Sequence, residues 1–311
     1  MVIDNKRWGI LYCPKGSTIR PNKRWERVEK ALRDNNIDYD YVQSENTGSV
    51  ERLIKMFTNS GYETIVIVGG DSALNDAVNC LMQIDSEKRK KISIGLIPNG
   101  VMNDFAHFWY MREDDEDRLI RSFKRKRIKK IDLGCIRYHN KYGEPCRRYF
   151  LNCVNVGFIA AIMNIRRKTR HLLKSRTLSF LFSFVLMIFQ RPDYKMHIKI
   201  NTDEVKRKVM TVCVGNALGY GQTPNAVPYN GQLDVSVVFH SEMTQLFDGI
   251  YLFLKGKFLN HRNVSPYRTK KVEFLDAEYA MVGIDGRLMK TPKGPFTIFI
   301  EPEVINFLLP D

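Results

Sequence analysis

The fold is indicated by the stretch IVIVGGDSALNDAVN at residues 65–79. Its first four residues are β-branched and predict a short buried strand, two glycines follow, and the chain then enters a helical pattern. Such a turn lets backbone amides approach phosphate oxygens, and the positive end of the helix dipole favours the anion. Since an ordinary tight turn can have the same sequence, this stretch alone is weak evidence for phosphate binding.

A second loop of the same kind follows one strand later, in IGLIPNGVMNDFA at residues 94–106. It again predicts a strand, a Pro/Gly turn and polar residues that open a helix. Asn103 and Asp104 have a simpler interpretation as residues that cap this helix. The carboxyl ends of neighbouring parallel strands meet at one edge of an open α/β sheet, which is the expected ligand position. We therefore expect the two loops to line one crevice.

The chain as a whole shows two different patterns of strand and helix signals, which predict two domains. Residues 1–130 alternate strand and helix signals, as a parallel α/β domain does, and the tail 301–311 is a candidate to complete it. Its strands are expected at Trp8–Tyr12, Tyr39–Gln43, Thr64–Val68, Ile92–Ile97 and Ile128–Leu133. Residues 131–300 cluster strand signals and predict an antiparallel, sandwich-type domain. Its strands are expected at Tyr149–Val154, Tyr194–Ile200, Val205–Val214, Leu233–Phe239, Val272–Leu275 and Phe296–Ile300, with helical insertions at 159–190 and 244–255.

The composition is that of a globular protein, because the 311 residues are 44% hydrophobic and 27% charged. The longest nearly uncharged apolar run, Thr177–Phe189, is shorter than the roughly 20 residues that a transmembrane helix needs. The first residues lack the apolar core of a signal peptide, which predicts a cytoplasmic protein. Six cysteines without a C-x-x-C pair favour neither a disulfide framework nor a zinc site.

Basic residues are concentrated in two windows. The net charge is +15, and Arg121–Lys130 with Arg166–Arg176 carry thirteen positive charges and no acid. An anionic partner is therefore expected. Because the second window adjoins an amphipathic stretch, we favour peripheral contact with an anionic membrane surface through Arg166–Arg176. The alternative is a solvated face, partly offset by the acidic run Glu113–Asp117. No nucleic-acid-binding module is recognised, so nucleic acid is not expected as a partner.

The two loops together resemble those of the diacylglycerol kinase catalytic family, which includes bacterial lipid kinases and sphingosine kinases. The resemblance rests on Gly69-Gly70-Asp71-x-x-Leu74-Asn75-Asp76 and on Pro98-x-Gly100-x-x-Asn103-Asp104-Phe105-Ala106. Ordered matches cover essentially the whole chain. They are Pro14 after the first strand, Thr47 after a later one, NCVNVGF at 152–158, VGN at 214–216, PNAVPYNGQLDV at 224–235 and Asp285-Gly286.

The resemblance implies an ATP-dependent kinase that phosphorylates a hydroxyl of diacylglycerol or a sphingoid-type lipid, with a role in phospholipid biosynthesis. The implied fold is NAD kinase/diacylglycerol kinase-like: a Rossmann-like α/β nucleotide domain, a β-sandwich lipid-substrate domain, and an active site in the cleft between them. Asp285 is implied as the general base, and Asp71 as the ligand of the catalytic Mg²⁺. Nucleotide binding is implied for Pro14, Thr47, Gly69, Gly70, Asp71, Ser72, Asn75 and Asn103, and substrate binding for Asn103 and Asp104.

The chain departs from the family pattern in its functional loops. Where the family has Gly-Gly-Asp-Gly-Thr, Ser72 and Ala73 follow Asp71, and Ser72 would cost roughly 1 kcal/mol if the turn required a positive φ. Val101 replaces a threonine. Asn230 replaces an aspartate that holds a structural magnesium in some members, which makes that metal site doubtful. Arg287 replaces the glutamate of Asp-Gly-Glu; it could bind phosphate, and it also stabilises ionised Asp285 and so weakens it as a base.

Two alternatives stay open beside the lipid kinase. A catalytically degraded member would bind nucleotide or lipid without turnover, and the four departures favour it. An NAD kinase has a Gly-Gly-Asp-Gly loop in a related fold, but the loop that contains Asn103 and Asp104 argues against it. The acceptor lipid and the oligomeric state, including a homodimer, are left undecided by the sequence.

Overall fold

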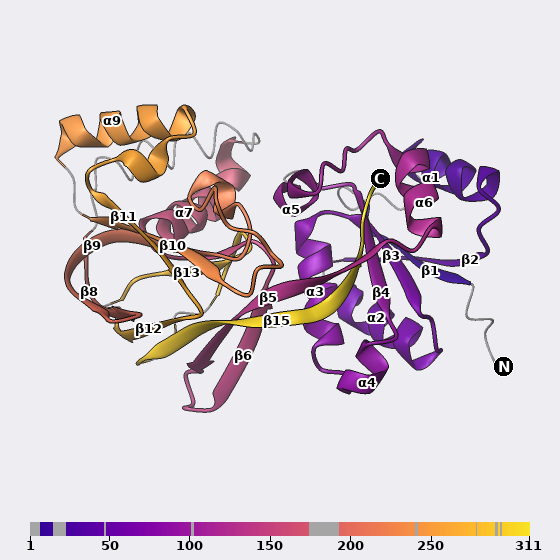
Figure 1. The fold of residues 1–311 in the computed structure, drawn as a ribbon, viewed down its shortest axis with the longest axis horizontal. Helices are drawn as coiled ribbons and strands as arrows, with labels where there is room; N and C mark the ends of the chain where they lie inside the picture. The colour runs from indigo at the N-terminus through magenta and orange to yellow at the C-terminus, as the bar shows by residue number, and fades with distance from the viewer. Residues whose placement is uncertain are drawn as a thin grey trace. The chain divides into compact units, whose positions relative to one another are not determined.

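The computed structural model describes residues 7–14, 23–46, 48–100, 103–173, 193–239, 242–277, 279–289, 292 and 294–311 (Figure 1). Thr47, Val101 and the side chains of Arg166–Arg176 lie outside the described residues. The chain divides into two compact units, residues 1–133 with 302–311 and residues 134–301. No helix in the described part is long and apolar enough to cross a bilayer.

The first unit is built on a parallel sheet whose order is β15-β4-β3-β1-β2. Every residue of β1 (Trp8–Tyr12), β3 (Thr64–Gly69) and β4 (Ser93–Pro98) is buried, whereas β2 (Tyr39–Gln43) is largely half-buried. This burial explains why the central strands are continuous apolar runs. The helices of the unit are α1 (Lys23–Asp34), α2 (Ser49–Asn59), α3 (Asp71–Leu81), α4 (Ser86–Arg89), α5 (Asp104–Phe108) and α6 (Glu116–Lys124).

The strand beside β4 comes from the far end of the chain. Residues 128–133 begin the long strand β5 (Ile128–His139), which pairs with β15 and β6, whereas the neighbour of β4 is the end of β15 (Phe296–Leu308). Asn306 lies opposite Ser93 there, in parallel register. The tail 301–311 was the candidate to complete this unit, but no neighbour was predicted for it, because the pairing joins residues more than two hundred positions apart and local pattern carries no such information.

The second unit is mainly antiparallel, with the main strand order β14-β13-β7-β9-β8-β12-β15. Its strands also include β6 (Pro145–Phe150), β7 (Cys153–Gly157), β8 (Tyr194–Ile200), β9 (Asp203–Gly215), β10 (Leu233–Phe239), β11 (Val264–Thr269), β12 (Lys271–Asp276), β13 (Val282–Ile284) and β14 (Arg287–Leu288). Its helical elements are α7 (Phe158–Leu173), η1 (Gly219–Gly221), α9 (Met243–Leu254) and η2 (Phe258–Asn260). Alternate inward side chains build one core, in which Phe274 and Phe296 stack with centroids 4.5 Å apart.

Two strand predictions in this unit were wrong. Residues 149–154 form no single strand, because Leu151 and Asn152 separate β6 from β7 and donate their amides to the side chain of Asp285. The strand β11 was missed because it contains Pro266, which usually argues against a strand. β11 pairs only with β10, and a proline is tolerated on such an edge.

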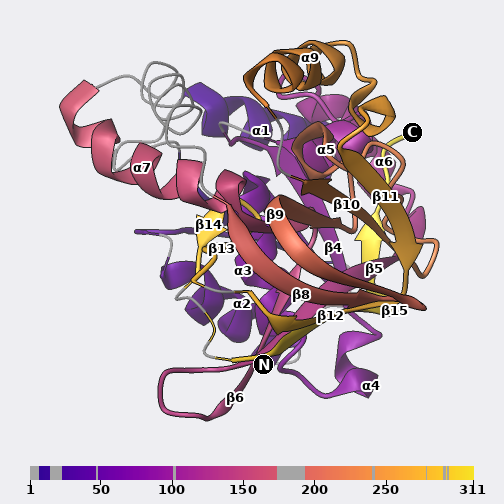
Figure 2. The same ribbon diagram turned by 90° about the vertical axis from the view of Figure 1, so that its left-hand side faces the viewer.

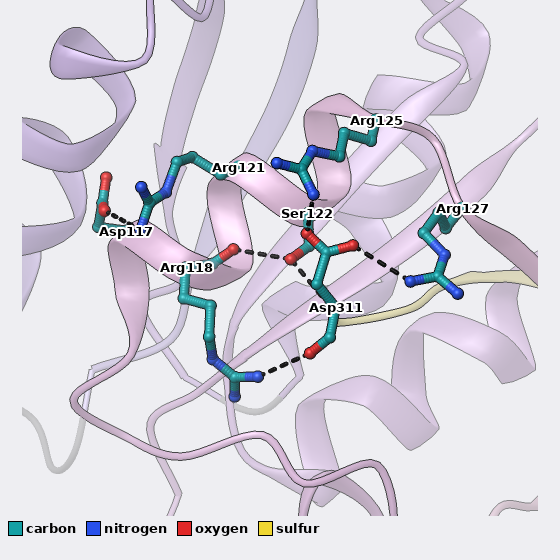
Figure 3. Close-up of polar contacts among 7 residues, drawn as sticks. All are labelled: Asp117, Arg118, Arg121, Ser122, Arg125, Arg127 and Asp311. Carbon is teal, nitrogen blue, oxygen red and sulfur yellow. Dashed lines mark hydrogen bonds and ion pairs between the residues drawn. The ribbon is translucent and has the colours of Figure 1, made fainter.

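The window Arg121–Lys130 covers the end of α6 and the start of β5, and three of its arginines already contact acidic side chains (Figure 3). The ion pairs are Arg121–Asp117 at 2.8 Å, Arg125–Asp311 at 2.6 Å and Arg127–Asp311 at 3.2 Å. The amide of Asp311 also donates to Ser122 Oγ at 3.0 Å. These contacts hold the segment after β15 against α6, and they offset part of the positive charge of the window.

Candidate functional site

The first glycine-rich loop joins β3 to α3. Gly70 is extended (φ −101°, ψ 179°), and its carbonyl accepts from the amides of Ala73 and Leu74 at 2.9 and 3.2 Å, which starts the helix. The N-terminus of α3, with its partial positive charge, therefore lies directly after the strand. A Cβ on Gly70 would lie 2.8 Å from Cα of Gly100, so the second loop packs against the first where no side chain fits.

Backbone and side-chain hydrogen bonds join three strand-end loops at this edge of the sheet. The amide of Asn99 donates to the carbonyl of Gly69 at 2.7 Å, and Asn99 Nδ2 donates to the carbonyl of Cys13 at 3.1 Å. The amide of Cys13 in turn donates to Val68 at 2.8 Å. The loops after β1, β3 and β4 therefore meet, and Pro14, which follows Cys13, is half-buried beside them.

Asp71 connects the two loops through its side chain. It is buried at the first position of α3, and its Oδ2 accepts from the amide of Phe105 at 3.0 Å. Because that amide belongs to the first turn of α5, the carboxylate of Asp71 caps the second helix as well. The residue that the resemblance implies for magnesium thus also fixes the two loops to each other.

Asn103 lies between the loops but does not cap the helix that it precedes. Its Oδ1 accepts from the amide of Gly100 at 3.0 Å, and its Nδ2 donates to Glu113 Oε1 at 3.0 Å. No side-chain capping bond from Asn103 to α5 is formed. The capping interpretation is therefore wrong for Asn103, because the carboxylate of Asp71 accepts the hydrogen bond from the first turn of α5 instead. Burial raises the pKa of Asp104, the first residue of α5, although His107 opposes the shift.

Ser72 is not strained. It lies exposed in the first turn of α3 and is not among the residues with positive φ, so the predicted cost of about 1 kcal/mol does not arise. Asn75, one turn further on, is buried, and its oxygen accepts from Asn79 Nδ2 at 3.2 Å. The helix thus accommodates serine in place of the family's glycine without a change of backbone.

Sequence reasoning missed a buried ion pair that supports the second loop. Arg24 of α1 pairs with Glu116 of α6, and both side chains are about 7% exposed. Arg24 Nη2 also donates to the carbonyl of Pro98, the last residue of β4, at 2.8 Å. The pair therefore ties two helices to the strand end that carries the loop. The two residues lie 92 positions apart and neither has a motif around it, so the sequence offered no local signal.

Asp285 lies in the second unit at the tip of the hairpin between β13 and β14. The hairpin pairs Ile284 with Arg287, so Asp285 and Gly286 form a two-residue loop, and both have positive φ (43° and 75°), as a type I′ turn requires. Asp-Gly is a strong sequence signal for such a turn. Asp285 and Gly286 therefore have a structural role in this turn in addition to the functional role that the resemblance implies.

Three backbone amides bind the buried carboxylate of Asp285. Oδ2 accepts from Leu151 at 2.8 Å, and Oδ1 accepts from Asn152 and Cys153 at 2.9 and 3.0 Å. Such bonds favour the ionised carboxylate over the protonated one. They anchor the hairpin to the start of β7, and they oppose the uptake of a proton that a general base requires.

The other predicted residues of the second unit are less enclosed. Arg287 is half-buried on β14, and Asn230 lies in an exposed turn where its Oδ1 accepts from the amide of Gln232 at 2.9 Å. Among the described side chains, no group of three or more histidines, cysteines, aspartates or glutamates could hold a metal ion.

Two family models match nearly the whole chain. The diacylglycerol kinase catalytic domain matches residues 7–136, and the YegS C-terminal NAD kinase beta sandwich-like domain matches residues 152–309. The chain belongs to the diacylglycerol kinase family. Membership supports a lipid kinase of the diacylglycerol kinase and YegS type and implies ATP as its phosphate donor.

Relatives and solved structures agree with the two family models. YtlR of Bacillus subtilis, provisionally named a lipid kinase, is 21% identical over an alignment of 312 positions that covers 96% of this chain and 98% of YtlR. A Bacillus anthracis structure, provisionally described as a diacylglycerol kinase, has a TM-score of 0.75, 17% identity and coverage of 98% and 97% of the two chains. Yeast NADH kinase has a TM-score of 0.56, 9% identity and coverage of 99% and 84%. The two structures show the fold, and they confirm the predicted NAD kinase/diacylglycerol kinase-like architecture.

Proposed function

We propose that the protein transfers the γ-phosphoryl group of ATP to a hydroxyl of a lipid, either diacylglycerol or a sphingoid-type acceptor. The observation that carries the proposal is the junction of the two strand-end loops, where Gly70 packs on Gly100 and Asp71 binds the amide of Phe105. Such a junction at the carboxyl edge of a parallel sheet, beside a helix N-terminus, suits the phosphates of a nucleotide.

In the proposed reaction, the lipid hydroxyl oxygen forms a bond to the γ-phosphorus as the bond to the bridging β–γ oxygen breaks. ADP leaves, and the hydroxyl proton passes to a base, for which Asp285 is the predicted residue. The amide bonds on Asp285 weaken it as a base, so positioning and charge neutralisation must supply most of the rate.

Asp71 suits magnesium carried in by ATP. Magnesium in kinases is held by one or two carboxylates together with substrate phosphates and water, and Asp71 supplies one buried carboxylate at the phosphate-facing turn. When bound, the ion neutralises phosphate charge. Asp71 also binds the amide of Phe105, so it fixes the two loops at the edge of the sheet beside which such phosphates would lie.

The second candidate is a family member that binds nucleotide or lipid without turnover. It is favoured by Arg287 in place of glutamate, together with the three amides on the carboxylate of Asp285. The amide bonds favour the ionised carboxylate, and the charge of Arg287 would do the same.

An assay with radiolabelled ATP and a total lipid extract separates the two candidates, with products identified by mass. A labelled lipid that disappears in Asp71→Ala supports the kinase. Arg287→Glu restores the family's residue; it should raise the rate if the arginine impairs the base and lower it if the arginine holds phosphate. ATP binding without any labelled lipid, in both parent and Arg287→Glu, would establish the non-catalytic candidate.

We further propose a peripheral location on an anionic membrane from the cytoplasmic side, with contact through Arg166–Arg176. The lysines and arginines of that segment are each worth about 1 kcal/mol near such a surface. Replacing Arg166, Arg167, Lys168 and Arg170 by glutamate should release the protein from anionic vesicles. Unchanged binding would contradict the assignment.

A further inference from the structure

The helix α9 exposes a row of large apolar side chains. Phe247 is 62% exposed, Tyr251 58% and Leu254 78%. Their spacing of four and three residues places them on one face, within an arc of about 60° at about 100° per residue. We call these three residues the α9 stripe. Figures 1 and 2 both show α9 running along the outside of the second unit.

The rest of α9 is firmly attached to its unit, so the stripe is not the result of a poorly packed helix. The carbonyl of Gln245 accepts from buried His261 at 2.9 Å, and Gln245 Oε1 accepts from Asn263 Nδ2 at 2.6 Å. Ile250 packs against the apolar cluster at the start of α7, and Phe253 forms an edge contact with Phe258. The helix therefore holds the stripe in a fixed outward direction.

Cations accompany the stripe. Lys255 and Lys257 follow Leu254 directly, both are exposed, and Lys255 Nζ lies 5.9 Å from the ring centre of Tyr251. The nearest acid on the helix, Asp248, lies 3.8 Å from His261 Nε2. Long lysine side chains beside an apolar helix face can keep their ammonium groups among lipid headgroups while the apolar groups enter the bilayer.

A second copy of this chain is a poorer occupant than a membrane. Three side chains exposed by about two thirds offer roughly 350 Å², whereas a stable interface needs about 800 Å² per partner. Two copies would also bring lysines of like charge together, and the whole chain carries +15. An anionic bilayer complements the lysines and accepts a small apolar contact.

We propose that the α9 stripe inserts into the headgroup region of an anionic lipid bilayer, with Lys255 and Lys257 at the phosphate level. At 12 residues, α9 lies along the interface and does not cross it. This insertion goes beyond the proposed kinase reaction, because it fixes which face of the second unit meets the membrane and is measured without phosphoryl transfer.

The first test is sedimentation of the full chain with vesicles of equal phosphatidylglycerol and phosphatidylcholine. Replacing Phe247, Tyr251 and Leu254 by glutamine should weaken binding by about tenfold or more, because the apolar area that leaves water on insertion is lost. The matched control replaces Tyr110, Tyr142 and Tyr279 by glutamine. On average these tyrosines are more exposed than the residues of the stripe, but they are scattered over the chain. One of them, Tyr142, also has a lysine beside it, since Lys141 Nζ lies 4.4 Å from its ring centre. The control should bind as the parent does.

The second test measures insertion itself and does not depend on the triple variant folding. Phe247→Trp places an indole on the stripe, whereas the native Trp8 and Trp25 are buried and Trp109 is half-buried, and all three are common to both tryptophan variants. Lipids brominated in the upper acyl chain should quench this indole upon vesicle binding, and they should not quench the indole of Tyr142→Trp. Failure of the parent to bind, equal binding of the stripe and control variants, or equal quenching of the two indoles would overturn the proposal. A parent dimer that the stripe variant dissociates, with vesicle binding unchanged, would identify a second copy as the occupant.

Discussion

Two adjacent glycines in the β3–α3 loop have different neighbours. A Cβ on Gly69 would meet Ala73, Ile67 and Cys13 at 3.1–3.3 Å, which small movements relieve, whereas a Cβ on Gly70 would lie 2.8 Å from the backbone of Gly100. Neither glycine has a positive φ. The need for glycine at position 70 is therefore set by the close approach of another loop and not by backbone conformation.

Gly70→Ala should move the second loop, cost about 1–3 kcal/mol of stability and abolish the protection that ATP gives against thermal unfolding. Gly69→Ala is the matched control and should keep most of that protection. The measurement is the change in Tm that saturating ATP produces in each variant, relative to its own ligand-free state. Full ATP protection in Gly70→Ala would place the nucleotide elsewhere.

Asp285→Asn replaces an acceptor by a donor opposite backbone N–H groups. We expect a loss of about 1–3 kcal/mol in stability as well as loss of lipid phosphorylation. Urea unfolding and turnover per folded molecule must therefore be measured together, with the exposed Asp203→Asn as control. Parental turnover in folded Asp285→Asn would reject Asp285 as the base and make Asp71 the next candidate.

At the scale of elements, α1, α6 and β4 are joined by the ion pair between Arg24 and Glu116. Arg27, which is more exposed, also contacts Glu116 at 3.2 Å. Burial lowers the pKa of Arg24 and Glu116 opposes that shift, so the contact with the carboxylate offsets part of the cost of burying the guanidinium. Arg24 also donates to the carbonyl of Pro98 at the end of β4, so the pair supports the loop of the candidate site that follows Pro98.

Glu116→Ala should cost about 3–5 kcal/mol, because it leaves the guanidinium of Arg24 buried without its carboxylate. The double variant Arg24→Met with Glu116→Leu should cost much less, since no buried charge remains. Urea unfolding of the two variants tests whether Glu116→Ala loses more stability than the double variant. If the double variant is the less stable, the pair contributes more attraction than its burial costs. ATP protection should fall in the double variant, because it loses the contact of Arg24 with Pro98, and it should be better kept in Glu116→Ala, which retains that donor.

Across the whole molecule, buried thiols make stability depend on alkaline pH. Burial raises the pKa of Cys13 and Cys80 to about 11 and that of Cys135 to about 12, against a usual 9.0. Between these values the unfolded chain releases thiol protons that the folded chain retains. The unfolded state therefore binds fewer protons, and the free energy of unfolding falls as pH rises.

The urea midpoint should thus be steady below pH 9.0 and fall as pH approaches 11. Cys80→Ala and Cys135→Ala should make that fall shallower, because each removes one proton from the balance. A steep fall that the variants leave unchanged would point to other groups, such as Tyr62, whose pKa burial raises to about 12 with help from Asp40.

Local pattern predicted much of the fold and part of the site. The strands β1, β2, β8 and β10 have the predicted bounds, because short runs of β-branched and aromatic residues between turn residues mark strands. The two loops could be found because glycine, proline and asparagine serve as local signals of a turn. The roles of those loops in binding nucleotide stay a prediction.

The sequence by itself determined the family, the alternation of strands and helices in the first unit, and the excess of positive charge. Only the tertiary structure decided which strand lies beside β4, which residue caps α5 and what holds the carboxylate of Asp285. Each of these depends on contacts between residues far apart in the chain, whose geometry no local spacing contains. The α9 stripe belongs to both: its spacing is in the sequence, but its exposure depends on which face of the helix the rest of the unit covers.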